Sequence, residues 1–196
     1  MRTRNSGKEQ LVKQKAIELL VKDGFEGFSM NKLARACDIS VATLYIYYKD
    51  KEDLIIRIAL EEAETMTQSV LKDFNPDMGF EEGLRLQWKN RSDYMLKNPM
   101  TSALFEQLRF STFSNRVFKK VKANFGSAMG KFMKNAVARG EINSMPMEVY
   151  WAVAYAPLYN LIRFHQEGKN MAGKPFVLTQ KLIWQTFELT LKGIKK

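Results

Sequence analysis

The chain has one cysteine and one histidine among its 196 residues, so two side chains that often serve as metal ligands or catalytic groups are scarce. A single cysteine cannot form a disulfide within the chain, which suits a reducing compartment. The sequence also has no evident nucleophile-base pair, metal-ligand spacing or glycine-rich phosphate loop. We therefore expect no catalytic residues, no metal site and no cofactor.

Long hydrophobic runs are missing as well. The longest uncharged segment, residues 149–162, contains Pro157 and Asn160. It is shorter than the roughly twenty apolar residues that a membrane-spanning helix needs. The first residues are too charged for the apolar part of a signal peptide. We expect a cytoplasmic protein without a membrane partner.

Acidic residues are outnumbered, with 31 Lys and Arg against 21 Asp and Glu and a net charge of +10. The excess does not lie where DNA binding is expected: residues 1–50 have nine basic and six acidic side chains, whereas residues 83–196 have nineteen and six. DNA binding must therefore depend on the positions of a few basic groups. The basic C-terminal part either improves solubility or meets an acidic partner.

Two helix starts, at Ser29 and Ser40, lie close together in the chain. Serine is a preferred N-cap residue, and apolar residues on either side of each serine form hydrophobic staples that set the direction of each helix. These pairs are Phe28 with Leu33 and Ile39 with Leu44. The spacing leaves room only for a tight turn, which is typical of a helix-turn-helix DNA-binding motif.

Neighbouring helices complete a small bundle. An amphipathic helix through Val12 and Leu20 should end at Gly24, and Asp50 should cap a helix that begins an apolar stripe at Leu54. In the helix after Ser29, one face should be buried (Met30, Leu33, Ala34 and Cys37) and one exposed (Asn31, Lys32 and Arg35).

The chain resembles the TetR-type transcriptional repressors over about its first sixty residues. The shared pattern is Phe28-Ser29, Ser40, Thr43-Leu44-Tyr45, Tyr47-Tyr48-Lys49, Lys51-Glu52 and Leu54. The chain departs from the family at Asp38 in the turn, where Gly is common, at Ala42 and at Tyr47-Tyr48. Asp tolerates a left-handed backbone better than most residues, so the turn should form.

The start of the second helix should reach base edges in the major groove. Val41 and Ala42 can only contact thymine methyl groups, and Thr43 can add one hydroxyl contact. Phosphate contacts should supply most of the affinity, from Ser29, Tyr45, Tyr47, Lys49 and Lys51, with Asn31 and Ser40 nearby. The resemblance implies that Tyr45, Tyr47 and Lys51 hold the DNA backbone, whereas we expect Tyr48 to pack inward. Arg2 and Arg4 either enter the minor groove as an arm or remain in solvent.

The rest of the chain shows helical periodicity, so we expect an all-α protein. A helix-turn-helix domain should cover residues 1–50, the start of a connecting helix residues 51–74, and a helical effector-binding and dimerisation domain residues 75–196. A helix from Met147 to about Gln166 is apolar nearly all round and contains Pro157, which should bend it and free a carbonyl near Val153. The last helix, Phe176 to about Gly193, has two apolar faces.

Each of the last two helices has more apolar surface than one core covers. A second copy of the chain can cover the remainder through a four-helix interface, as the resemblance also implies. The two reading helices would then lie about 34–36 Å apart and fit a palindromic double-stranded operator.

Apolar and aromatic residues of the C-terminal part could line a pocket for a hydrophobic or amphipathic small molecule. The candidates are Trp88, Met95, Phe105, Arg109, Phe113, Phe125, Met129, Phe132, Trp151, Tyr155 and Tyr159. Arg109, Asn160, Arg163 or His165 could supply a polar end. Such residues are also common in ordinary cores.

The favoured interpretation is a homodimeric repressor that a small molecule releases from DNA. Two alternatives remain. One is an enzyme, which the composition disfavours, and the other is a DNA-binding regulator controlled by a protein partner at its basic face. The sequence does not indicate the effector or the operator.

Overall fold

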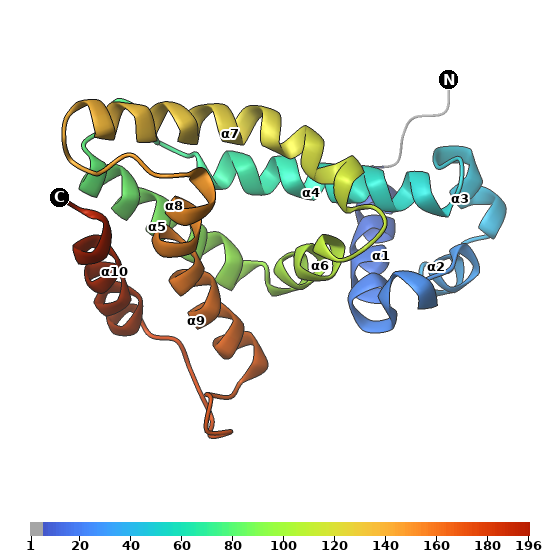
Figure 1. Ribbon diagram of the computed structural model, residues 1–196. Coiled ribbons are helices and arrows are strands. Elements are labelled where there is room, and N and C mark those ends of the chain that lie inside the picture. The colour runs from blue at the N-terminus through green and yellow to red at the C-terminus, as the bar shows by residue number, and fades with distance from the viewer. Residues whose placement is uncertain (1–5) are drawn as a thin grey trace. The chain divides into compact units, whose positions relative to one another are not determined.

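The computed structural model describes residues 6–196, with the side chains of residues 6 and 120–125 excepted. The described chain is all helical, as expected, with only isolated bridges at Ile142–Lys195 and Lys169–Pro175 (Figure 1). The helices are α1 (Ser6–Gly27), α2 (Met30–Ala36), α3 (Val41–Tyr47), α4 (Lys51–Val70), α5 (Phe80–Lys97), α6 (Pro99–Arg109), α7 (Ser114–Ala138), α8 (Met147–Ala154), α9 (Ala156–Glu167) and α10 (Gln180–Ile194). None of these helices is both long and apolar enough to cross a membrane.

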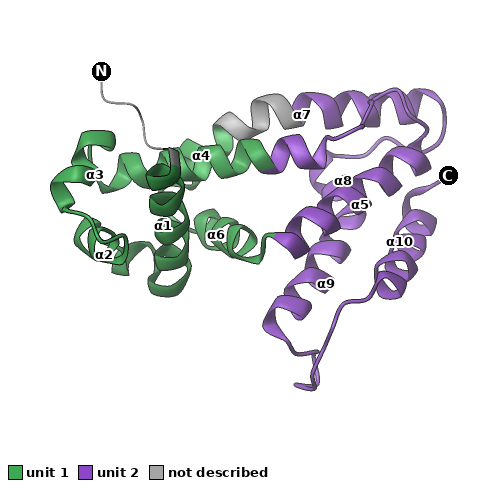
Figure 2. Cartoon of the chain, turned by 180° about the vertical axis from the view of Figure 1, so that it is seen from behind, with its two compact units in different colours: residues 1–65, 98–121 green, residues 66–97, 122–196 purple. Residues whose placement is uncertain are grey.

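The chain divides into two compact units (Figure 2). Unit 1 contains residues 1–65 and 98–121, and unit 2 contains residues 66–97 and 122–196. The division differs from the boundary expected near residue 75, because α6 and the start of α7 group with the N-terminal helices. Long helices explain the difference, since α4 and α7 each run from one unit into the other.

The core of unit 1 forms around the amphipathic faces of its helices. Leu20, Leu33, Leu44 and Leu54 are each at most 1% exposed and come from four different helices. The helix expected to end at Gly24 does break there, because Gly24 has φ 72° and ψ 172°, although a further turn continues to Gly27. Glycine adopts this positive φ without the steric cost that a β-carbon brings.

The core of unit 2 is rich in aromatic rings. Phe132 stacks on Phe80 with ring centres 5.8 Å apart, and Trp88 meets the edge of Phe187 at 5.4 Å. Tyr150 and Tyr155 are fully buried, and their hydroxyls lie 3.3 Å apart. Burial raises the pKa of both phenols, so both remain neutral at physiological pH.

One long helix expected over residues 147–166 is in fact two. The chain leaves helical geometry at Tyr155, with φ −126° and ψ −30°, between α8 and α9. Pro157 explains the break, because it lacks an N–H and its ring collides with the carbonyl four residues earlier. The neighbouring carbonyl of Ala154 accepts a 2.7 Å hydrogen bond from the indole N–H of Trp88.

The expected start of the last helix at Phe176 is wrong. Helix α10 begins at Gln180, after the N-cap residue Thr179, whose hydroxyl accepts a hydrogen bond from Leu182 N at 3.3 Å. Before it, residues 168–178 form a compact loop in which Phe176 N donates to Gly168 O and Leu178 N donates to His165 Nδ1. His165 thus supports a loop with its ring nitrogen.

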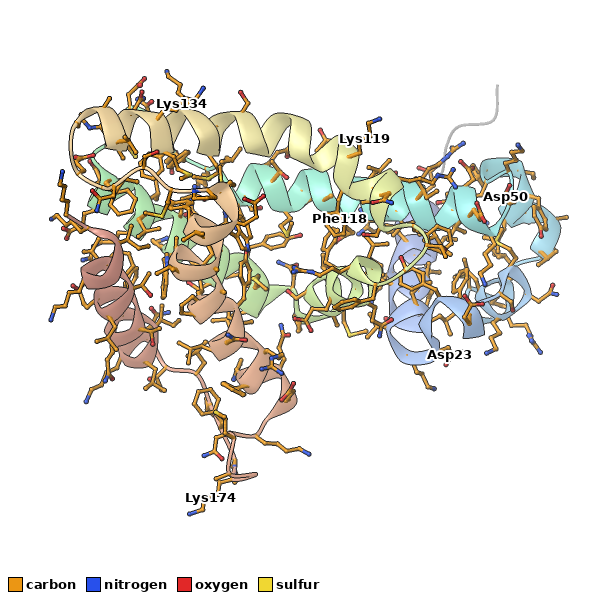
Figure 3. The ribbon with its side chains drawn as sticks, in the orientation of Figure 1. Asp23, Asp50, Phe118, Lys119, Lys134 and Lys174 are labelled. Atoms are coloured by element: carbon orange, nitrogen blue, oxygen red, sulfur yellow. The ribbon has the colours of Figure 1, made fainter. Side chains whose placement is uncertain are left out.

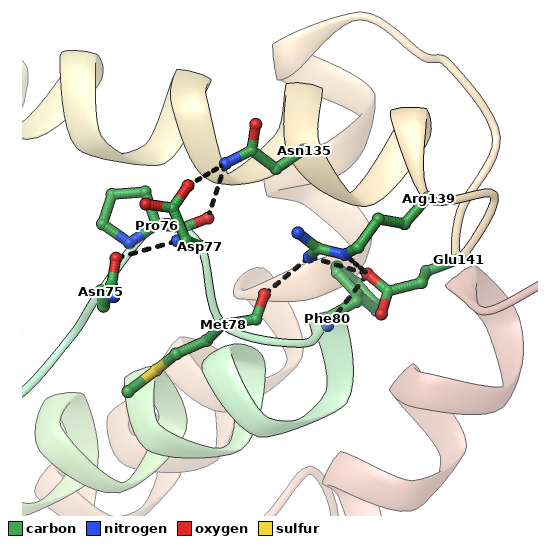
Figure 4. A network of polar contacts seen from close by, with 8 residues as sticks. All are labelled: Asn75, Pro76, Asp77, Met78, Phe80, Asn135, Arg139 and Glu141. Atoms are coloured by element: carbon green, nitrogen blue, oxygen red, sulfur yellow. Dashed lines mark hydrogen bonds and ion pairs between the residues drawn. The ribbon is translucent and has the colours of Figure 1, made fainter.

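Polar side chains of α7 hold the loop between α4 and α5 (Figure 4). Asn135 Nδ2 donates to Pro76 O and to Asp77 Oδ1, and Arg139 donates to the backbone carbonyl of Met78. Just after α7, Glu141 accepts the N–H of Phe80, the first residue of α5. These contacts fix the point at which α5 enters the core of unit 2.

Candidate DNA-binding site

Helices α2 and α3 form a helix-turn-helix in unit 1, and both predicted caps are confirmed. Ser29 Oγ accepts a hydrogen bond from Lys32 N at 3.2 Å, and Ser40 Oγ accepts one from Thr43 N at 3.2 Å. Each serine thereby satisfies one of the N–H groups that a helix start leaves without a partner. The caps define where both short helices begin.

The turn between the two helices depends on Asp38. Its φ of 52° places it in the left-handed region, as expected for an Asp at a position where Gly is common. Cys37 N donates back to Leu33 O, and Ile39 N donates to Ala34 O at 3.0 Å. Burial raises the pKa of the Cys37 thiol, so this cysteine is a packing residue rather than a reactive one.

Helix α3 is anchored on one side and open on the other. Leu44 is 1% exposed, whereas Tyr45 is 51%, Ile46 68% and Tyr47 38% exposed. Val41 is half-buried against the core of unit 1, and Ala42 is exposed. The exposed side chains of α3 are therefore accessible to a partner.

Asp53 organises the junction between α3 and α4, where Figure 3 shows Asp50. Its carboxylate accepts Lys49 N at 3.0 Å and Arg57 Nε at 2.9 Å, and its own N–H donates to Asp50 Oδ1 at 2.8 Å. The Lys49 N–H and the Arg57 guanidinium lower the pKa of Asp53. Arg57 also donates to the carbonyl of Tyr47. This network fixes the backbone that carries Tyr47, Lys49 and Lys51.

Tyr48 points inward, as expected. It packs against the core of unit 1, burial raises the pKa of its phenol, and Arg57 lies over its ring at 6.0 Å. Sequence reasoning missed Arg57 and the positioning role of Asp53. The i,i+4 spacing of the two residues on one helix was an available signal.

The remaining predicted DNA contacts lie around α2 and the chain start. Asn31 is exposed on α2, and Ser29 precedes it. Lys32, beside them, bonds Asp23 Oδ2 and Gly27 O, each at 2.8 Å, and so ties α2 to the end of α1. Arg4 lies outside the described residues.

The predicted ligand-binding residues fall in both units. Phe105, Arg109 and Phe113 belong to unit 1. There, Phe113 is buried against Phe25 at 5.5 Å, Phe105 lies 6.4 Å from Phe118, and Arg109 is exposed at the end of α6. Unit 2 contains Trp88, Met95, Met129, Phe132, Trp151, Tyr155 and Tyr159. The side chain of Phe125 lies outside the described part of the chain.

Within unit 2, the structure adds a buried cation to this group. Arg91 is 4% exposed, donates to the Tyr159 hydroxyl and to Gln87 Oε1, and lies 4.2 Å from the ring centre of Tyr155. No role for Arg91 was predicted from the sequence. An arginine within an apolar helix stripe was the available signal.

Two of the surface hollows among the described residues lie elsewhere. One, of about 360 Å³, is lined by Lys49, Asp50, Glu52, Asp53, Ile56 and Arg116, and the Arg116–Glu52 ion pair at 2.9 Å lies beside it. The other, of about 380 Å³, lies along α7 near Gly126 and Lys134. Neither hollow is lined by a predicted ligand-binding residue. Within the described residues, no group of three or more His, Cys, Asp or Glu side chains is arranged to hold a metal ion.

Residues 12–58 match the family described as bacterial regulatory proteins, tetR family. The chain is 27% identical over 104 residues to an HTH-type transcriptional regulator of Haemophilus influenzae, covering 53% of this chain and 56% of that one. It is 25% identical over 71 residues to the fatty acid metabolism regulator protein of Bacillus subtilis, covering 36% and 37%. The match thus spans about half of the first relative and little more than a third of the second.

The fold extends this similarity to the full chain. A TetR family transcription regulator from Marinobacter aquaeolei superimposes with a TM-score of 0.85 over 100% of both chains, at 22% identity. At that identity the superposition establishes the fold, and the match over residues 12–58 covers the helix-turn-helix. Residues 12–58 thus resemble the tetR family of bacterial regulatory proteins, and the whole chain has the fold of a TetR family regulator.

Proposed function

We propose that this protein is a homodimeric transcriptional repressor that binds a palindromic DNA operator and is released by a hydrophobic or amphipathic small molecule. The observation that carries the proposal is the exposure of α3 in a capped helix-turn-helix. Leu44 anchors the helix while Tyr45, Ile46 and Tyr47 remain open to a partner. In this motif, the second helix enters the major groove.

Phosphate contacts supply most of the affinity in this proposal. Tyr45, Tyr47 and Lys49 are exposed, and Lys51 begins α4 immediately after the junction held by Asp53. Phenol hydroxyls and lysine ammonium groups are typical ligands of DNA phosphates, and they fix the register of the protein on the duplex. The proposed contacts also include Ser29, Asn31 and Arg4, with Ser40, Val41, Ala42 and Thr43 near the bases.

A second copy of the chain is proposed to pack against α8, α9 and α10. Ile183 and Phe187 of α10 are buried in the core of unit 2, whereas Leu189 on the same helix is 65% exposed. On α8, Val149 is 48% and Val153 is 37% exposed. Unit 2 thus covers one apolar face of these helices and leaves apolar side chains on another, which supports a two-fold interface.

The effector is proposed to bind among the aromatic residues of unit 2. Trp88, Trp151, Tyr155 and Tyr159 provide apolar surface, and Arg91 beside them adds polar groups. The curated relative from Bacillus subtilis is named a fatty acid metabolism regulator, which fits an amphipathic effector. Effector binding would shift the reading helices. It would weaken DNA binding to the extent that the effector has a higher affinity for the released conformation of the protein than for the DNA-bound conformation.

Equilibrium binding to a duplex selected from a random pool by the full chain tests this function. We expect salt-dependent binding with two chains per duplex. Tyr47→Phe and Lys51→Ala should weaken binding, and Lys51→Ala should also lower the salt dependence, because each phosphate contact releases about one counterion. Lys134→Ala is the matched control, since Lys134 is an exposed lysine on α7 of unit 2, outside the proposed dimer interface.

The outcome separates the alternatives. Unchanged affinity and salt dependence in both variants would contradict the proposed DNA contacts, and no duplex binding at all would contradict the repressor function. Titrating the complex with fatty acids and other amphipathic molecules tests the effector. If no molecule in a broad panel changes DNA affinity, control by a protein partner is favoured.

A further inference from the structure

The exposed side chains of α3 are arranged around a single apolar ridge. With 3.6 residues per turn, Ala42 and Ile46 lie one turn apart on the same face, and Ile46 lies about 160° around the helix from Leu44. Leu44 is 1% exposed and Ile46 is 68% exposed. The most outward face of α3 is therefore formed by a methyl group and a branched alkyl chain.

The polar groups of α3 are directed elsewhere. Ser40 Oγ accepts the N–H of Thr43, and the hydroxyls of these two residues lie 2.9 Å apart, with one donating to the other. Tyr45 and Tyr47 lie on either side of the ridge, about 100° from Ile46 in each direction. The side chains with hydrogen-bonding capacity are thus occupied or placed at the flanks.

Packing within the chain does not account for an isoleucine at this position. Val41 on the same helix and Tyr48 just after it contact the core of unit 1, and Leu44 is part of that core. Ile46 leaves most of its apolar surface in solvent, beside the exposed rings of Tyr45 and Tyr47, so these three side chains together form a surface that a partner could cover. Lys49 and Lys51 follow in the chain, so the partner that fits this surface carries negative charge around an apolar centre.

We infer that the protein reads its operator by apolar contact between the Ala42–Ile46 ridge and the 5-methyl groups of thymines in the major groove. This inference rests on the proposed DNA binding. Thymine is the base that presents a methyl group in that groove, and aliphatic side chains discriminate it by contact rather than by hydrogen bonding. The flanking phenols and lysines then hold the phosphates on either side of the groove.

Replacing thymine by deoxyuridine tests the inference, because it removes the methyl group and keeps the base pair. The duplex selected by the full chain is compared with copies that carry deoxyuridine at single thymine positions of one half-site. We expect at least one position at which affinity falls about fourfold, as burial of one methyl group is worth roughly 0.8 kcal/mol. Ile46→Ala should bind the thymine duplex more weakly and lose this discrimination.

Two controls make the result specific. Ile46→Val keeps an aliphatic chain and should retain most of the discrimination. Lys51→Ala should lower affinity for thymine and deoxyuridine duplexes by the same factor, since a phosphate contact carries no base information. Because Ile46 is exposed, its substitution should leave the thermal unfolding midpoint unchanged.

Three results bear against the inference in distinguishable ways. If no selected duplex is bound, the proposed function fails and the inference fails with it. If the duplex is bound but no deoxyuridine position matters, DNA binding stands and methyl readout is wrong. If Ile46→Ala discriminates as strongly as the original chain, the methyl groups are read by other residues and the assignment to the ridge is wrong.

Discussion

In α2 and α3 of unit 1, the polar contacts that define the helices join residues three positions apart, as in Ser29 with Lys32 and Ser40 with Thr43. In unit 2, two buried polar contacts join residues far apart in the chain. Gln87 Nε2 donates to the carbonyl of Val70, and Trp88 Nε1 donates to the carbonyl of Ala154. Local contacts thus shape the candidate reading helices, whereas long-range contacts hold the candidate effector unit.

The local and the long-range contacts also differ in how much their loss reduces the free energy of unfolding. A cap satisfies groups that are largely exposed to water, so its loss costs about 1 kcal/mol. Removing a buried donor that bonds a distant carbonyl leaves that carbonyl without a hydrogen-bond partner, and this cost adds to that of the cavity. We therefore expect substitutions in the core of unit 2 to reduce the free energy of unfolding more than cap substitutions in unit 1.

Trp88→Ala should produce the largest effect. The indole is fully buried, bonds Ala154 O at 2.7 Å and packs against Phe187. Its removal leaves a cavity and an unpaired carbonyl, and the expected loss in the free energy of unfolding is about 3–5 kcal/mol. Urea unfolding followed by far-UV circular dichroism measures it. Trp184→Ala, at a half-buried tryptophan of α10, should cost clearly less, and equal losses would contradict the special role of Trp88.

Gly83→Ala is the next largest expected effect. A β-carbon on Gly83 would lie 2.5 Å from Cε2 of Phe132. That ring is itself held between Phe80 and Phe74, so it cannot move freely. We expect a loss of about 1–3 kcal/mol in the free energy of unfolding, measured by urea unfolding.

Gly130→Ala in α7 is the matched control for this substitution. A β-carbon on Gly130 would meet nothing within 4 Å. Alanine favours a helix over glycine by up to about 1 kcal/mol, so this variant should be slightly stabilised. If both variants shift stability in the same direction, the close approach of α5 to Phe132 is not what requires glycine at position 83.

The same contrast explains how much of the structure could be predicted from the sequence. Both serine caps, the left-handed Asp38 and the break at Gly24 follow from local chemistry, and each was predicted correctly. The signals are residue types at fixed short spacings, which a sequence displays directly. The position of the helix-turn-helix could therefore be predicted well.

Long-range contacts could not be predicted in this way. The start of α10 was misplaced because the loop before it is held by Gly168 and His165, and its apolar residues resemble the start of a helix. The buried position of Arg91 depends on Tyr159, 68 residues away. Ile46 is a different case: its outward position follows from helical periodicity, so the sequence alone could have indicated it.

Ser40→Ala gives the smallest expected effect and sharpens the comparison between the units. The variant loses the oxygen that accepts Thr43 N, and the free energy of unfolding should fall by about 1 kcal/mol. Ser29→Ala should cost a similar amount, and Ser40→Asn should restore most of the loss because Asn is also a good cap. Thermal unfolding measures all three variants.

Amide hydrogen exchange then shows where the loss of the Ser40 cap is felt. Because this contact is local, faster exchange should be confined to α3 and the turn before it, with α5, α8 and α9 unchanged. For Trp88→Ala, by contrast, faster exchange should spread over α5, α8 and α9, because the lost contact joins segments far apart in the chain. If Ser40→Ala also raises exchange in those helices of unit 2, α3 is not stabilised locally, and the distinction between locally and distantly determined structure does not hold for this fold.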